Sequence, residues 1–199
     1  MNYRAIASLF LLLPLLFGNA SATTGAQVNP DAQTGVTSGV YNYDENGPRS
    51  KPEGATPWTD FSMHGTAWVR ETPGAFLRWK IMGWGIEAKA KAAGYQWVHI
   101  PIPYAAYLED VAQKVNHVEF CAQSTNGAAT KPVTLHARTS AALVGNVAVT
   151  WAANNNRQCA WINWSPGVWR EDIGISVQLY FANTTDQITL YKAWLRTER

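Results

Sequence analysis

The chain has 199 residues, enough for one folded domain, and 16 Lys and Arg against 14 Asp and Glu give a formal net charge of +2. This near balance offers no basic footprint for a nucleic-acid partner. Apolar residues make up 47% of the chain and charged residues 15%, which argues against disorder over the whole length. One number is unusual and needs an explanation: the chain has ten tryptophans.

The first 22 residues have the three-part pattern of a secretory signal peptide. Arg4 gives a positive start, residues 6–17 are mostly apolar, and Ala20-Ser21-Ala22 offers small residues for cleavage. The apolar run is shorter than the roughly 20 residues that a membrane-spanning helix needs. We therefore expect a secreted protein, periplasmic or extracellular, with no membrane span.

Export determines how the two cysteines are interpreted. Cys121 and Cys159 both lie after the predicted cleavage site. In an oxidising compartment an even number of cysteines favours a disulfide. A catalytic or redox cysteine is the alternative, but the sequence has no CxxC motif to support it. We predict a Cys121–Cys159 bond.

The composition changes sharply near residue 58. Residues 23–57 hold five glycines and four prolines but no Leu, Ile, Phe or Trp, which favours a flexible, disordered arm. Tyr41 and Tyr43 interrupt this composition, so a short strand docked on the domain at these residues is an alternative. All ten tryptophans lie in residues 58–199, which we expect to form the folded domain.

Within that domain the hydrophobic pattern has a period of two, which predicts strands. Residues 173–181 alternate most clearly, and residues 188–195 follow after the turn 183–186, so the two are expected to form a hairpin. Short helical turns are expected at 88–93 and 104–113. Many short strands separated by turns predict an all-β, antiparallel β-sandwich, of jelly-roll type. The further expected strands lie near residues 62–70, 76–80, 83–89, 95–102, 115–121, 133–138 and 147–151.

One segment has a more specific pattern. Trp97-Val98-His99-Ile100-Pro101-Ile102-Pro103 follows Gly83-Trp84-Gly85 and precedes the expected strands 115–121 and 174–181. This order resembles uncharacterised bacterial secreted β-sandwich proteins with a W-x-H-x-P-I-P segment. The resemblance covers most of residues 62–196 and implies the fold, but it implies no activity. Because prolines lack an N–H donor, both belong at a strand end or edge.

The familiar catalytic motifs, such as GxSxG, HExxH and the P-loop, do not occur in the sequence. Acidic pairs occur at Glu109-Asp110 and Glu171-Asp172. Neighbours on a strand point to opposite faces, so neither pair alone supplies the two facing carboxyls of a glycosidase. We interpret both pairs as solvated charges.

A metal site has a weak basis in the sequence. His117 and Glu119 share a strand face, and His136 would complete a three-ligand set if strands 115–121 and 133–138 paired in the right register. A shift of one residue would separate them, and polar residues on a solvent face are the simpler interpretation. We expect no cofactor.

The tryptophans are the better lead, because an exposed indole offers a flat apolar surface with one N–H donor that suits a sugar ring. Trp97 shares a strand face with His99, opposite Val98 and Ile100, so it is expected to point away from the core. Trp161 and Trp164 have opposite parity, so one of them faces outward. The candidate ligand-binding residues are Trp97, Arg157, Asn163, Trp164, Trp169 and Arg170.

Three functions fit these patterns. The first is a secreted, non-catalytic protein that binds a glycan or cell-surface polymer through exposed tryptophan. The second is a structural or protein-interaction protein of the envelope or exoproteome, which would show a large contiguous apolar patch. The third is a hydrolase on a jelly-roll scaffold, which would bring two carboxyls or a His set together in a pocket. Fold alone does not choose among them.

Overall fold

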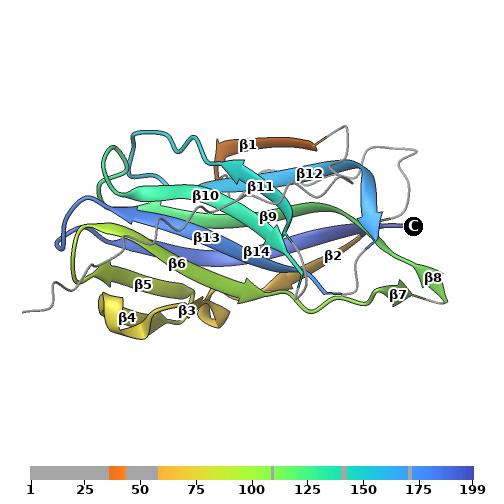
Figure 1. The fold of residues 1–199 in the computed structure, drawn as a ribbon, viewed down its shortest axis with the longest axis horizontal. Helices are drawn as coiled ribbons and strands as arrows, with labels where there is room; N and C mark the ends of the chain where they lie inside the picture. Colours follow the sequence, from red (N-terminus) through yellow and green to blue (C-terminus); the bar gives the residue numbers. More distant parts are fainter. Residues whose placement is uncertain (1–35, 44–57, 109, 140–142, 170–171) are drawn as a thin grey trace, which may run out of the picture.

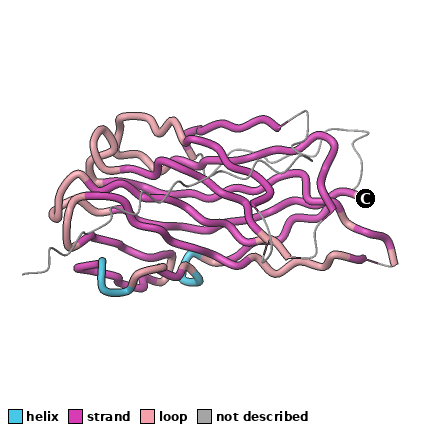
Figure 2. The backbone as a smooth tube through the Cα atoms, viewed as in Figure 1, coloured by secondary structure: helices cyan, strands magenta, loops and turns pink. Residues whose placement is uncertain are grey.

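The computed structural model describes residues 36–43, 58–108, 110–139, 143–169 and 172–199. These residues form an antiparallel β-sandwich whose strands run along the long axis, with loops gathered at the ends (Figures 1 and 2). The predicted signal peptide lies outside the described residues. The helices within the described ranges are two 3-10 turns, Gly65–Ala67 (η1) and Pro73–Ala75 (η2).

The first sheet has seven strands in the order β1-β12-β9-β14-β5-β4, and β2 also pairs with β14. Its strands are β1 (Val36–Asn42), β2 (Trp58–Met63), β4 (Phe76–Met82), β5 (Gly85–Ala90), β9 (Lys114–Ser124), β12 (Gln158–Trp169) and β14 (Ile188–Glu198).

The second sheet has five strands in the order β11-β10-β13-β6-β3, and β7 and β8 form a separate two-stranded ribbon. Its strands are β3 (Val69–Arg70), β6 (Gly94–Pro101), β10 (Lys131–Arg138), β11 (Leu143–Ala148) and β13 (Gly174–Phe181), and the ribbon consists of β7 (Tyr107–Leu108) and β8 (Val111–Ala112).

The strand order is that of a jelly roll, as predicted. The row β12-β9-β14-β5 in one sheet faces the row β11-β10-β13-β6 in the other. Among these strands, every connection except the β10–β11 hairpin passes from one sheet to the other. The core lies between the sheets, where Val118 and Phe120 of β9 and Ile175, Val177 and Leu179 of β13 are buried.

The predicted hairpin of residues 173–181 and 188–195 is wrong, although both strands exist. β13 pairs with β10 and β6, whereas β14 pairs with β9, β5 and β2 in the other sheet. Both strands bury one face in the same core, so alternation alone does not show that the chain crosses between the sheets.

The two predicted helical turns are also wrong. Residues 88–90 complete β5, where Ala88 and Ala90 are buried, and residues 91–93 turn into β6. Residues 104–113 carry the ribbon strands β7 and β8. The alanines at 88 and 90 occupy crowded inward positions of a strand, which a helix-propensity argument does not detect.

The folded sheet includes a strand from the segment predicted as an arm. β1 pairs with β12 along its whole length, from Val36 opposite Trp164 to Asn42 opposite Gln158. The sequence around Tyr41 and Tyr43 allows a short strand docked on the domain, and β1, which includes Tyr41, is that strand. Residues 23–35 and 44–57 of that segment lie outside the described residues.

The predicted disulfide is confirmed. Cys121 of β9 and Cys159 of β12 lie directly opposite each other, with Cα atoms 4.0 Å apart, and their sulfur atoms are bonded. In the part of the chain that the structure covers, no helix has the length and apolar character to cross a bilayer.

Candidate functional site

The outward side of the five-stranded sheet carries a row of aromatic and polar side chains. Side chains alternate along a strand, so Val98 and Ile100 are buried in the core while Trp97 and His99 lie on the opposite face. The parity predicted for Trp97 is therefore confirmed. Register adds residues of β13 and β10 to this face. We call this surface the aromatic strip: Tyr95, Trp97, His99, His136, Ser176, Gln178 and Tyr180.

Ring contacts order the strip at two levels. Tyr95 is 61% exposed and lies across from Tyr180, with ring centroids 5.0 Å apart. Two residues further along β6 is the half-buried Trp97. Its ring centroid lies 4.8 Å from that of His136, at an interplanar angle of 46°. Each contact restrains an aromatic ring at the surface, as a platform for another ring would require.

The next level is a polar row across three strands. Ser176 stands opposite His136 on one side and His99 on the other, and the Ser176 Oγ lies 2.8 Å from the His99 Nδ1. Burial lowers the pKa of both imidazoles and the nearby Arg138 charge adds to this, while Glu71 raises the pKa of His99. Both rings are therefore neutral at neutral pH, so the row offers hydrogen bonds without charge.

The strip ends in a hollow of about 760 Å³ where β6 ends and β13 begins. The W-x-H-x-P-I-P segment supplies one wall, and Pro101 is the last residue of β6, as expected of a proline. Most of the lining is apolar, and its polar groups belong to Tyr104, Arg138, Thr139, Asp172 and the His99–Ser176 pair. The lining residues are Met63, His99–Tyr104, Arg138, Thr139 and Asp172–Ser176.

The expectation that Trp164 faces a ligand is wrong. Trp164 is 3% exposed and belongs to the core, where a Cβ placed at Gly145 would lie 2.7 Å from its ring. Trp161, of opposite parity, is the outward one and stacks on His117, with ring centroids 6.2 Å apart. Parity predicts that the two indoles lie on opposite faces, but it does not say which face is the core.

The remaining predicted residues are not gathered on one surface. Asn163 of β12 hydrogen-bonds His117, and Arg157 precedes β12, so both lie with the seven-stranded sheet rather than with Trp97. Trp169 is 40% exposed at the end of β12 and makes an edge contact with Tyr107. Arg170 lies outside the described residues.

The hypothetical metal set is not assembled. The His117 Nε2 lies 3.4 Å from the Glu119 Oε2 on β9, but His136 belongs to β10 in the other sheet. β9 pairs with β12 and β14, so the required pairing with β10 does not occur. The sulfur atoms of Cys121 and Cys159 also lie near Glu119, but their disulfide leaves no thiolate to bind a metal.

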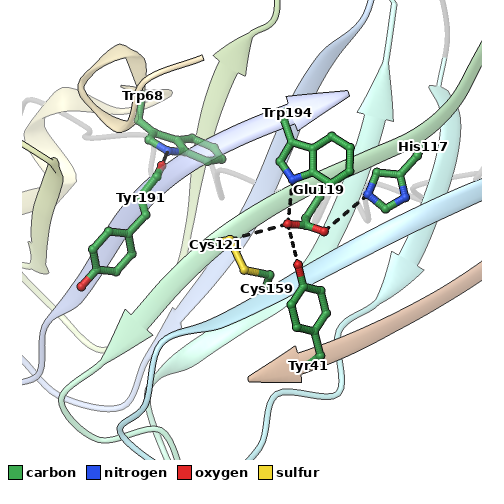
Figure 3. Close-up of a disulfide and its surroundings, with 8 residues drawn as sticks. All are labelled: Tyr41, Trp68, His117, Glu119, Cys121, Cys159, Tyr191 and Trp194. Atoms are coloured by element: carbon green, nitrogen blue, oxygen red, sulfur yellow. Dashed lines mark hydrogen bonds and ion pairs between the residues drawn. A yellow bond between two sulfur atoms is a disulfide. The ribbon is translucent and has the colours of Figure 1, made fainter. Parts of the chain in front are cut away.

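Glu119 instead joins three strands through a buried carboxylate (Figure 3). It is 2% exposed, and its Oε1 accepts hydrogen bonds from the Tyr41 hydroxyl at 2.9 Å and the Trp194 Nε1 at 2.7 Å. Burial raises the pKa of this carboxyl, but the contacts with His117, Trp194 and Tyr41 outweigh burial and lower it. Glu119 therefore holds β1 and β14 against β9, a structural role.

Sequence reasoning missed the exposed Tyr95 and Trp84 and the half-buried Tyr180. Tyr95 and Tyr180 have the same parity as Trp97 in the register of β6 and β13, so pairing these two strands correctly would have found them. Trp84 lies in the turn between β4 and β5, where alternation gives no information.

The comparisons with known proteins give no family. No protein-family model and no curated protein matches the sequence. A solved structure described as "Carbohydrate-Binding Module CBM36 in complex with calcium and xylotriose" is similar at a TM-score of 0.39 and 11% identity, covering 67% of this chain and 98% of that one. The resemblance to W-x-H-x-P-I-P proteins stays a prediction.

Proposed function

We propose that this protein is exported and binds a neutral glycan along the aromatic strip. The observation that carries the proposal is the position of Trp97, on the outward side of the five-stranded sheet between the Tyr95–Tyr180 pair and the hollow. From Tyr95 to Pro101 the strand rises roughly 20 Å, a length that suits several sugar units in a row.

The chemistry of the strip matches a sugar chain. The indole and phenol rings offer flat apolar surfaces to the C–H faces of sugar rings, and Gln178 and the imidazoles offer donors and acceptors to hydroxyl groups. The lowered pKa values of His99 and His136 keep both rings uncharged, which favours a neutral ligand over a charged one. The predicted signal peptide and the disulfide support export.

The test is calorimetric titration with neutral β-linked and α-linked oligosaccharides. Trp97→Ala is expected to weaken binding of any active glycan at least about fivefold, because stacking on an aromatic ring contributes about 1 kcal/mol beyond the buried area. Trp169→Ala is the matched control, an exposed indole at the end of β12 outside the strip. Wild-type affinity in Trp97→Ala, or no binding across the panel, would contradict the proposal.

A hydrolase is the second candidate, because Ser176 and His99 form a hydrogen-bonded pair at the wall of the hollow. A neutral imidazole beside a hydroxyl is the arrangement that activates a serine nucleophile. Incubation with a fluorophosphonate probe and intact-mass analysis separates the two functions. Labelling of Ser176 would favour hydrolysis, whereas an unlabelled protein that returns its bound oligosaccharide intact would favour binding alone.

A further inference from the structure

A second aromatic surface lies on the seven-stranded sheet, apart from the strip. It surrounds Tyr191 of β14 and encloses a hollow of about 450 Å³. None of its residues belongs to the strip, and β14 and β12 are in the other sheet from β6 and β13. We call it the tyrosine hollow; its lining residues are His64, Gly65, Gly83, Trp84, Arg157, Tyr191 and Lys192.

The hollow has a fixed aromatic platform. Trp84 is 46% exposed and stacks on Tyr191, with centroids 5.5 Å apart and planes 26° from parallel. The Tyr191 hydroxyl donates to the Gln123 Oε1 at 2.7 Å, and its carbonyl accepts from the Trp68 Nε1 at 2.7 Å (Figure 3 shows the second contact). Because Tyr191 is held at both ends, the exposed indole that rests on it keeps its orientation.

Among the described residues that line the hollow, the charged ones are cationic. The Arg157 guanidinium lies between two phenol rings, 3.8 Å from the centroid of Tyr43 and 4.0 Å from that of Tyr191. The Lys192 Nζ lies 5.3 Å from the Tyr43 centroid. Two cations and His64 line the hollow, and no described carboxylate is among the lining residues.

An exposed indole beside two cations matches the chemistry of an acidic sugar. The ring of such a sugar stacks on the indole, and its carboxylate or sulfate is met by the Lys192 ammonium, with the Arg157 charge beside it. We propose that the tyrosine hollow binds the negatively charged sugar units of an acidic polysaccharide. This goes beyond the proposed function, because it gives the protein a second, independent site for a ligand of different charge.

Two sites on opposite sheets would let one molecule hold two polymer chains together. Each sheet has its core-facing side covered by the other sheet and an outward side that faces away from it. The strip and the tyrosine hollow occupy these two outward sides. A mixture of neutral and acidic polysaccharide is then expected to be cross-linked by the full chain.

The experiment titrates the full chain with an oligogalacturonate, a sulfated oligosaccharide and an uncharged oligosaccharide at low and high salt. Trp84→Ala is expected to weaken the acidic ligand at least tenfold, and Lys192→Gln to weaken it severalfold and reduce the salt dependence. Lys91→Gln, just after the end of β5 that lies away from Trp84, makes the same charge change as a matched control and is expected to bind normally. The carboxylate and sulfate arms show which anion is preferred.

The strip and the tyrosine hollow are tested separately by Trp97→Ala. This variant is expected to keep wild-type affinity for the acidic ligand, even if no neutral glycan binds the strip. The proposal is overturned if neither acidic ligand binds, if Trp84→Ala and Lys192→Gln both bind as the wild type does, or if Trp97→Ala abolishes acidic binding. Unfolding curves of each variant show whether a loss of affinity comes from loss of the fold.

Discussion

Replacing Trp164 by alanine distinguishes a core residue from a ligand-binding one. The side chain is 3% exposed and packs against β11 at Gly145. A tryptophan side chain buries about 200 Å², which at about 25 cal/mol per Å² corresponds to roughly 5 kcal/mol. Residual burial in the unfolded chain reduces this figure, so the expected loss is about 3–5 kcal/mol, the range observed for large core aromatics.

The assay is thermal and urea unfolding followed by far-UV circular dichroism, without reductant. A loss of about 3–5 kcal/mol lowers the melting temperature of a domain of this size by roughly 10 °C. Trp169→Ala serves as the comparison, because Trp169 is 40% exposed and its removal is expected to change the midpoint by far less. A Trp164→Ala protein with the wild-type midpoint would refute the placement of this indole in the core.

Three further predictions concern the stability of the folded sheets. Reduction of Cys121–Cys159, which are 38 residues apart, is expected to lower the free energy of unfolding by up to about 4 kcal/mol, measured by urea titration with and without reductant. Tyr41→Phe removes the phenol donor to Glu119, so amide exchange in β1 is expected to speed up while β13 keeps its protection; equal rates in β1 would exclude this anchor. Because burial lowers the pKa of His99 and His136, and contacts lower that of Glu119, the unfolded chain binds more protons than the folded one. The free energy of unfolding is then expected to have its full value above about pH 6.5, to decrease as the pH falls below about 6.5, and to decrease further below about pH 4.3. A free energy of unfolding that increases on acidification would contradict these directions.

Much of the architecture could be predicted from local patterns. Period-two alternation locates β9, β10, β13 and β14, and the outward parity of Trp97 follows from the apolar Val98 and Ile100 beside it. The disulfide follows from an even number of cysteines in a chain expected to be exported. These features depend on residues close in sequence or on simple counting.

The rest depends on pairings between distant strands. Trp161 and Trp164 alternate equally well in either orientation of β12, so the sequence does not show which one enters the core. The same limit applies to His136, whose strand pairs with β11 and β13 rather than with β9. The tyrosine hollow combines a turn, the residue before β12 and the middle of β14, and no single segment contains its pattern.

The central claim is that the aromatic strip around Trp97 meets the ligand, and the indole N–H signals of the protein test it most directly. Each of the ten tryptophans contributes one such signal, and single substitutions assign those of Trp97, Trp164 and Trp169. On titration with a neutral oligosaccharide that binds, we predict that the Trp97 signal moves with saturation while the Trp164 and Trp169 signals stay in place. A stationary Trp97 signal at saturating glycan would contradict the account.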